Sequence, residues 1–498
     1  MTASNNASTG SGVGRAGRGN QATHGAGRQS NGAPHIRLGV NVLASGRHDA
    51  AWKTFADKRA LPTDIDHFVA IAKAAERGLI DAIFLADGPG GLVSEAYTRP
   101  WRALDPMVLI AHLAAHTKHV GLVCTTTSLF GHPHTVARQL ASIDHMSHGR
   151  AAWNVITSQN PPALNAFGVE KGWDQAARYQ RAEEFVQVVT QLWDSVPHEA
   201  VVADPETNVY LDPTLMRNVD FKGKHFSARG ALSVPETPQG RPVIFQAGQS
   251  ADSKAFGARY ADALFTGQRV IEAARVFYAD VKGLAKGYGR NPDHLLVMPG
   301  LFPILASTDE EAQRHKRGLD DLLDSVALRA LLAEHLAVDP DQLADLDGPI
   351  PYAQSQANEH LVPIASRWHR AEMLKEAQRN NWNVRELLFS NITGGHRVFT
   401  GTPEGFANDM MHWVDSKGAD GFNLNIDVQP TGLDLIADEV IPVLQKHGRY
   451  RRAYEGSTLR ENLGLPRFDA RYDARPDLHF DGVSQDVKAP SDPVAVAA

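Results

Sequence analysis

The polar side chains that could do chemistry gather between Cys124 and Tyr179. Two short apolar runs in this stretch, GLVCTTTS and RAAWNVITS, have the composition of buried strands, and PHTVARQLASIDHM between them has helical spacing after a proline. A strand–helix–strand unit collects reactive polar groups at the carboxyl ends of its strands. Hydroxyl and amide groups at these ends bind polar ligands or simply close turns. The residues concerned are Thr126, Thr127, Ser128, Asn154, Thr157, Ser158 and Gln159.

Three more segments place candidate groups directly after predicted strands. In LADGPGG, the carboxylate of Asp87 precedes glycines that let a ligand approach the backbone, although an Asp-Gly turn explains the pattern equally well. In FQAGQSADS, a helix begins near Ser250, so its free amides form a seat for a phosphate, or Ser250 is an ordinary helix cap. In SGRHDAAWK, His48 beside Trp52 is either a proton-transfer group or an idle loop residue.

Metal-dependent and nucleophilic chemistry find little support in the sequence. His132 and His134 flank a proline near a predicted helix start, and no HExxH frame or G-x-S-x-G motif is present. The single cysteine, Cys124, lies inside an apolar strand, which favours a buried hydrophobic side chain over a reactive thiol. We therefore predict no metal site and no hydrolase nucleophile.

The elements that must position these groups alternate between strands and helices along the chain. A (β/α)8 TIM barrel of the α/β class is favoured over an open doubly wound sheet, because eight strands are each followed by a helical pattern and no GxGxxG follows a strand. The predicted strands are Ile36 to Leu43, Ala82 to Ala86, Gly121 to Ser128, Arg150 to Ser158, Val243 to Ala247, Ala263 to Thr266, Leu295 to Leu305 and Gly421 to Ile426.

The 498 residues divide into a barrel and two tails. Residues 1–34 are rich in Gly, Ser and Asn with little to bury, which predicts a disordered tail. Residues 35–467 form the predicted barrel, with long insertions at about 197–241 and 309–402 that we expect to build a pocket or lid. Residues 468–498 are predicted to be a surface strap with a frayed end.

The composition limits the binding partners and the cellular compartment that we expect for this protein. The chain is 43% hydrophobic and 21% charged with a net charge of -7, and it has no basic block that would indicate nucleic-acid binding. No apolar run approaches the roughly 20 residues that a membrane helix needs. The N-terminal stretch lacks the apolar centre of a secretory signal. With one cysteine, these features predict a soluble cytoplasmic protein that binds neither membranes nor nucleic acids.

Several ordered segments resemble one family. They include SLFGHPHTVARQLASIDHMSHGRAAWNVITS, RYQRAEEFVQVVTQLWDS, PVIFQAGQSADSKAFGARYADALFTG and GTPEGFANDMMHWVDSKGADGFNLN. Over residues of about 36–467 the chain is similar to the branch of bacterial luciferase-like FMN-dependent monooxygenases that contains the nitrilotriacetate, dibenzothiophene-sulfone and EDTA monooxygenases. The resemblance implies FMN as the cofactor.

The resemblance also implies roles for particular residues. Those expected to line or contact the flavin are Asp87, Thr126, Asn154, Ser158 and Gln159, and those expected to hold the FMN phosphate are Tyr179, Gln249 and Ser250. Some relatives carry a histidine where this chain has Gln159, and a glutamine cannot act as an acid or base. Proton transfer is therefore assigned to His48, or to solvent, and His335 is a stand-in for a second histidine found in relatives.

The chemistry implied by the resemblance is that of a two-component enzyme. Reduced FMN arrives from a separate NAD(P)H-dependent flavin reductase and reacts with O₂, and a small organic substrate is oxygenated beside nitrogen, sulfur or a halogen, so that the C-N, C-S or C-halogen bond breaks. A homodimer or homotetramer is expected. A flavin-degrading monooxygenase or lyase of the same branch and a non-catalytic flavin-binding protein are the alternatives.

Overall fold

Eight parallel strands close into a barrel in the computed structural model, which describes residues 34–88, 99–157, 159, 161–323, 325–362, 364–391 and 396–468. The pairing runs around the barrel and closes between β10 and β11, so the predicted TIM-barrel class is confirmed. The barrel strands all fall inside the eight predicted runs; they are β1 (Arg37–Asn41), β2 (Ala82–Leu85), β3 (Gly121–Thr127), β4 (Ala151–Ile156), β9 (Val243–Ala247), β10 (Ala263–Thr266), β11 (Leu296–Leu305) and β13 (Gly421–Leu424).

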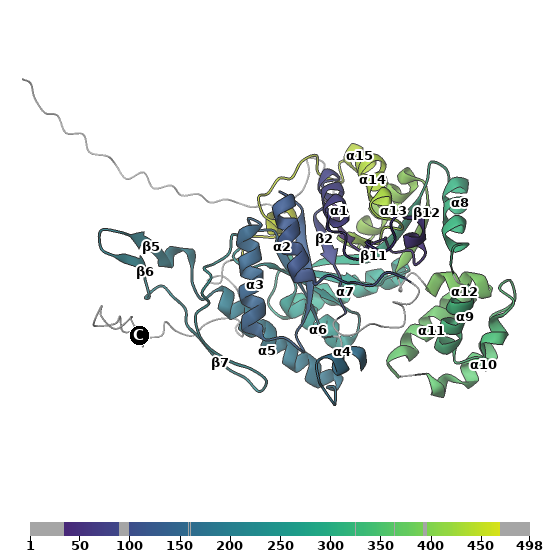
Figure 1. Ribbon diagram of the computed structural model, residues 1–498, viewed down its shortest axis with the longest axis horizontal. Helices are drawn as coiled ribbons and strands as arrows, with labels where there is room; N and C mark the ends of the chain where they lie inside the picture. Colours follow the sequence, from purple (N-terminus) through teal and green to yellow (C-terminus); the bar gives the residue numbers. More distant parts are fainter. Residues whose placement is uncertain are drawn as a thin grey trace, which may run out of the picture.

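Helices follow the strands and cover the outside of the barrel (Figure 1). Asp64, Asp105, Asp174 and Ser250 each accept a backbone amide at a helix start, and these caps fix where the helices begin. The covering helices are α1 (Ile65–Arg77), α2 (Pro106–His116), α3 (Pro133–Met146), α5 (Gln175–Trp193), α6 (Ala251–Tyr260), α7 (Ile271–Gly287), α13 (Pro403–Asp415), α14 (Thr431–Leu435) and α15 (Ile441–Lys446). A π-helical turn, Ile436–Val440, joins α14 to α15.

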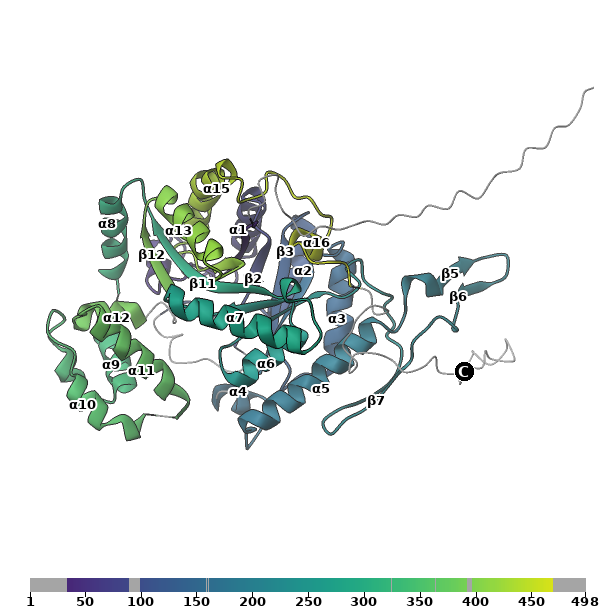
Figure 2. The same ribbon diagram turned by 180° about the vertical axis from the view of Figure 1, so that it is seen from behind.

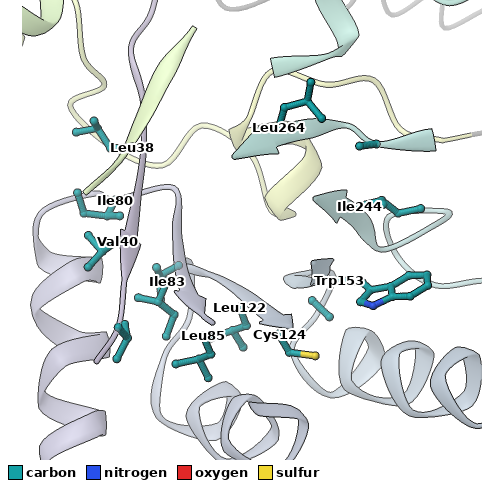
Figure 3. Packing of buried hydrophobic residues seen from close by; sticks show 14 of the residues in the cluster. Leu38, Val40, Ile80, Ile83, Leu85, Leu122, Cys124, Trp153, Ile244 and Leu264 are labelled. Atoms are coloured by element: carbon teal, nitrogen blue, oxygen red, sulfur yellow. The ribbon is translucent and has the colours of Figure 1, made fainter. Parts of the chain in front are cut away.

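Two apolar layers stabilise the barrel, and they follow the alternation of side chains along each strand. Outward residues such as Leu122 and Trp153 pack against the helices, together with Cys124, which is buried as predicted and whose thiol pKa is raised by that burial (Figure 3). Inward residues such as Val123 and Phe245 fill the barrel itself. A side chain's position along a strand therefore decides whether it faces the helices or the barrel interior.

The two insertions form separate structures at opposite ends of the molecule (Figures 1 and 2). The first contains two antiparallel hairpins, β5 (Val201–Asp204) with β6 (Val209–Leu211) and β7 (Val219–Lys222) with β8 (Ser227–Gly230). The second contains helices around their own core of residues that include Leu332, Leu343 and Leu387. Its helices are α8 (Asp309–Asp320), α9 (Ser325–Leu336), α10 (Tyr352–Ala357), α11 (Ile364–Arg379) and α12 (Val384–Asn391).

Several regular elements were not predicted: the hairpin strands of the first insertion, and two elements after the second insertion. After the second insertion, β12 (Arg397–Gly401) pairs with the outer half of β11 and extends the sheet beyond the barrel. Helix α13 then begins behind the cap Thr402 and Pro403, a combination of start signals that the sequence does contain. The remaining short elements are α4 (Pro161–Ala166), α16 (Leu459–Asn462) and 3-10 turns at Ala51–Thr54, His198–Ala200, Pro292–His294, Pro340–Leu343 and Glu359–Leu361.

The amino ends of the strands are closed by the last described segment of the chain. Leu459, Leu463 and Leu465 join the inward-facing apolar layer at this end. Buried arginines in the same segment pair with aspartates that directly precede strands: Arg451 with Asp81, and Arg460 with Asp262 at 2.8 Å. Among the described residues, no helix is long and apolar enough to cross a membrane.

Candidate active site at the carboxyl ends of the strands

The loop after β1 is fixed over the barrel mouth by the loop after β13. The Arg47 amide donates to the Ile426 carbonyl at 2.6 Å, and the His48 amide donates to the Asp427 carbonyl at 3.2 Å. Gly46 has φ +115°, and a Cβ there would overlap the Asp427 carbonyl. Only glycine fits this position, so the side chains that follow it have a rigid base.

His48 is buried and both of its ring nitrogens are engaged. Nδ1 accepts the Ala50 amide at 3.2 Å, which places the ring proton on Nε2, and Nε2 lies 3.1 Å from Asp320 Oδ1 of α8. Lys316 donates to the other oxygen of Asp320 at 2.6 Å. This arrangement ties the β1 loop to α8. It gives His48 a positioning role, while its catalytic role stays a prediction.

A second histidine at the mouth, His396, was missed in the sequence. Its ring stacks on Phe265 with centroids 5.2 Å apart, and the absence of a side chain at Gly300 leaves room for it. Nδ1 is buried and has no hydrogen-bond partner among the described residues. Burial, together with the nearby Arg47 and Arg269, lowers the pKa of His396 to about 3, so the imidazole is neutral. The only sequence signal is a histidine just before a strand-like run.

Two cavities meet at these histidines. One, of about 480 Å³, is bounded by the β1 loop, the end of β2 and residues 99–109. The other, of about 860 Å³, lies between the outer ends of β11 and β12 and helices α8, α11 and α12. His48 and His396 line both cavities. The barrel mouth therefore continues into a space walled by the second insertion.

The predicted residues on β2 and β3 lie at different depths. Asp87 is half-buried after β2; burial raises its pKa, while the Gly88 amide and Arg102 oppose that rise. Thr126 is half-buried and shares the outward alternation of Cys124. Its neighbours Thr125 and Thr127 are buried and have the inward alternation of Val123. Thr125 is thus a candidate that sequence reasoning did not single out, and strand alternation is the signal that could have found it.

The predicted residues on β4 are brought close to β3. Asn154 is buried opposite Thr125, and its Nδ2 donates to Thr125 Oγ1 at 3.0 Å. Asn154 Oδ1 has no partner among the described residues. Gln159 has both amide atoms engaged by Trp173, whose amide donates to Oε1 at 2.9 Å and whose carbonyl accepts from Nε2 at 2.5 Å. Ser158 lies outside the described residues.

A third group surrounds the starts of α5 and α6. The ring of Tyr179, in the second turn of α5, lies 5.9 Å from that of Phe256. Ser250 caps α6 by accepting the Ser253 amide at 3.2 Å. Gln249 accepts from Gln268 at 3.4 Å. Arg178, beside Tyr179, donates to the Thr157 carbonyl at 3.0 Å, and its Nε has no partner within the described part of the chain.

The α6 start can hold an anion. The backbone amides of the first helical turn point out of the helix, and the helix dipole adds partial positive charge. The Arg178 guanidinium contributes a full charge at the neighbouring α5 start. His335, the suggested stand-in, lies in α9 and is absent from the described lining of both cavities. No cluster of three His, Cys, Asp or Glu side chains that could hold a metal occurs in the described ranges.

The chain is similar to known proteins of one family. Residues 40–420 match the family model described as luciferase-like monooxygenase. The chain is 40% identical over 440 residues to N-acetyl-S-(2-succino)cysteine monooxygenase of Bacillus subtilis, covering 88% of this chain and 98% of that protein. It is 36% identical over 445 residues to nitrilotriacetate monooxygenase component A of Aminobacter aminovorans, covering 87% and 97%. A riboflavin lyase solved with modified FMN and riboflavin is similar with a TM-score of 0.72 and 26% identity, covering 86% and 96%.

Proposed function

Because this chain belongs to the luciferase-like monooxygenase family, as its sequence motifs predicted, we propose that it is the oxygenase of a two-component system. In this proposal a separate NAD(P)H-dependent reductase supplies reduced FMN, and O₂ is used to oxygenate a small organic substrate. Oxygenation beside nitrogen, sulfur or a halogen would cleave the bond to carbon. A relative's description as component A of a monooxygenase supports the two-component arrangement.

The observation that carries the proposal is a set of unpartnered polar atoms around the barrel mouth. Asn154 Oδ1, His396 Nδ1 and Arg178 Nε are buried without partners among the described residues. Buried polar atoms are normally hydrogen-bonded, so these groups mark a place where the described residues do not satisfy one another. Amide and imidazole groups fit the polar edge of a flavin ring, and the α6 start with Arg178 fits its phosphate. The residues present therefore fit FMN.

The residues predicted from the resemblance divide between the two parts of the cofactor. We assign Asp87 and Asn154 to the flavin ring, and Tyr179, Gln249 and Ser250 to the phosphate. Thr126 is kept as a proposed ring contact from the resemblance, although its strand alternation turns it toward the helices. Ser158 and Gln159 are kept as ring contacts, although the Gln159 amide is already bonded to the Trp173 backbone. When bound, reduced FMN supplies the electrons that activate O₂.

The protein's own contribution is to exclude water and to hold a proton. Phe265 and His396 form a stacked wall where the two cavities meet. His396 is neutral and lines both cavities, so its imidazole can exchange a proton with substrate, whereas His48 has both nitrogens engaged. We therefore propose that the His396 ring handles the proton and that His48 fixes the loop. A catalytic His48 is the alternative.

Several properties stay proposals from the sequence. We propose that the functional unit is residues 35–467, with the 1–34 tail and the 468–498 strap outside it. We also propose a cytoplasmic homodimer or homotetramer that binds neither membranes nor nucleic acids.

The test is oxygen incorporation with an added flavin reductase, NADH and FMN. Aminopolycarboxylates, sulfones, thioethers and halogenated aromatics are supplied under ¹⁸O₂, and we expect one labelled oxygen atom in the product of one class. Tight flavin binding with no substrate-dependent product would sink the monooxygenase proposal and leave a flavin-binding protein. Consumption of the isoalloxazine itself would support the flavin-degrading alternative, which the similarity to a riboflavin lyase favours.

A further inference from the structure

Gln159 holds the chain that enters α5 with both polar atoms of its side-chain amide. Nε2 donates to the Trp173 carbonyl at 2.5 Å and Oε1 accepts the Trp173 amide at 2.9 Å, although the two residues are 14 positions apart in the chain. We propose that this pair of bonds, the Gln159 clamp, makes Gln159 a positioning residue for the FMN phosphate seat. The proposal rests on the proposed function, because the seat belongs to that function.

The clamp acts at the entry to the helix that carries two groups of the proposed seat. Trp173 directly precedes Asp174, whose carboxylate caps α5 by accepting the Ala177 amide at 2.8 Å. Arg178 and Tyr179 follow within the same helix. A shift of the chain at Trp173 would therefore move both of these side chains relative to the α6 start. Side chains that bind a ligand need supporting bonds of this kind to hold their geometry.

Further bonds join the start of α5 to β4 and to α6. Arg178 donates to the carbonyl of Thr157, just after β4, at 3.0 Å. Gln175, the first residue of α5, donates to Asp252 in the first turn of α6 at 2.5 Å. The end of β4 and the starts of both helices are thus held together before any ligand arrives. Little ordering is then left to oppose binding of a phosphate, and such preorganisation raises affinity.

Gly172 gives the Gln159 amide the space that the clamp needs. A Cβ at position 172 would lie 2.8 Å from Gln159 Oε1 and 3.1 Å from Nε2. Both distances are shorter than the roughly 3.5–4.0 Å of a favourable contact between heavy atoms, so the amide would have to move away from Trp173. The φ angle of Gly172 is not in the left-handed region, so the backbone there accepts an alanine. Alanine at position 172 would therefore open the clamp without changing Gln159.

The side chain of Trp173 is held by groups on other elements. The Arg181 guanidinium of α5 lies 5.6 Å from the centroid of the Trp173 ring, and Arg181 Nε donates to the Leu129 carbonyl after β3 at 3.2 Å. The Phe130 ring lies 6.2 Å from the Trp173 ring. Gln159 therefore binds the backbone of a residue whose ring is already packed, and the clamp joins the β3 loop, the β4 end and α5.

Binding of FMN compared with riboflavin separates a positioning role from a direct contact with the flavin ring, because only FMN carries the phosphate. Gln159→Met keeps the length of the side chain and removes both bonds, and Gly172→Ala displaces the amide. In fluorescence titrations of the full chain, we expect each variant to lose about ten-fold in affinity for FMN and less than about two-fold for riboflavin. The double variant should lose no more than the larger single loss, because both changes open the same clamp.

Two controls accompany these titrations. Gly283→Ala lies at an exposed position of α7 with no heavy atom within 4 Å of its Cβ, and it should change neither affinity. The thermal unfolding midpoint of each variant shows whether it folds. If Gln159→Met does not fold, Gly172→Ala alone decides between the outcomes.

Several results would overturn the proposal. Equal losses for FMN and riboflavin in Gln159→Met would make Gln159 a contact of the flavin ring. Unchanged FMN affinity in Gly172→Ala, or additive losses in the double variant, would show that the clamp does not position the seat. A parent protein that binds FMN no more tightly than riboflavin would have no phosphate seat. If the affinities change as expected but no labelled oxygen enters any product, the proposed function fails and the positioning role of Gln159 stands.

Discussion

The two ends of the barrel differ in what fills them. At the amino ends of the strands, leucines from the last described segment fill the interior, and the carboxylates of Asp81 and Asp262 each pair with an arginine. At the carboxyl ends, two cavities remain, and His48 and His396 line both of them. The chain itself fills one end and leaves space for a ligand at the other.

This difference predicts whether a substitution changes the stability or the activity of the protein. In barrels of this kind, stability and catalysis are assigned to opposite faces, because loops at the carboxyl ends vary without disturbing the strands. Substitutions at the closed end should lower the free energy of unfolding and leave the activity per folded molecule unchanged. Substitutions at the open end should lower the activity per folded molecule and leave the free energy of unfolding nearly unchanged. The following changes test that separation, beginning with the largest expected effect.

Asp81→Ala should destabilise the protein through the closed end of the barrel. The Asp81 carboxylate pairs with Arg451 and accepts the Leu38 amide at 2.7 Å, and all of these groups are buried. Its loss leaves a buried unpaired charge, so we expect about 3–5 kcal/mol lower free energy of unfolding in urea. The matched control is Asp434→Ala, which breaks an exposed pair with Arg77 and should cost less than about 1 kcal/mol. Equal losses from the two variants would contradict the comparison.

His396→Asn should affect catalysis with little effect on stability. Removing the neutral imidazole should lower kcat about 100-fold, the usual size of an acid–base contribution, with an unfolding midpoint close to that of the parent. Steady-state oxygenation with added reductase measures it, and His412→Asn on the exposed side of α13 is the control. Because burial keeps the pKa of His396 near 3, kcat should show no limb from this residue between pH 5 and 8. An unchanged kcat in His396→Asn, with loss in His48→Asn, would return proton transfer to His48.

Local signals explain why the fold could be predicted. Strand runs such as GLVCTTT are apolar and bounded by turns, and helix starts such as the one after Asp64 carry a capping side chain. These signals depend on neighbours in the sequence. The same reasoning correctly placed Ser250 at a helix start, because a cap is a local feature.

The parts of the site that were not predicted depend on distant contacts. His396 gains its meaning from Phe265 and from the space at Gly300, which belong to strands far away in the sequence. The short β12 beside it exists because the outer half of β11 offers an edge. Gln159 could be recognised as a departure from relatives, but its bonding to Trp173 could not be read from the residue type.

The pH dependence of the free energy of unfolding tests the role of a buried histidine at the closed end. His35 is buried against Tyr450, and burial, with Arg37 and Arg451, lowers its pKa to about 4. The unfolded chain binds this proton below about pH 6.5 while the folded chain does not, so stability falls as the pH falls from 7 to 5, by at most about 2 kcal/mol from this residue. His35→Gln should flatten that part of the urea-measured pH dependence without changing kcat at pH 7. An identical slope in both proteins would contradict this assignment.

The smallest expected effect concerns Ser250, an open-end helix cap that we also assign to the phosphate seat. Ser250→Ala should lower the free energy of unfolding by about 1 kcal/mol and also weaken FMN binding several-fold, because the same hydroxyl caps α6 and faces the proposed phosphate seat. Thr308→Ala is the matched control, since Thr308 caps α8 in the same way away from that seat, and should lower stability alone. Ser250→Asp separates the two roles: aspartate still caps the helix, but its charge repels a phosphate. Equilibrium titration should therefore show Ser250→Asp losing more affinity for FMN than Ser250→Ala, with riboflavin binding unchanged in both. If riboflavin and FMN weaken equally, Ser250 acts only through the helix and the phosphate lies elsewhere.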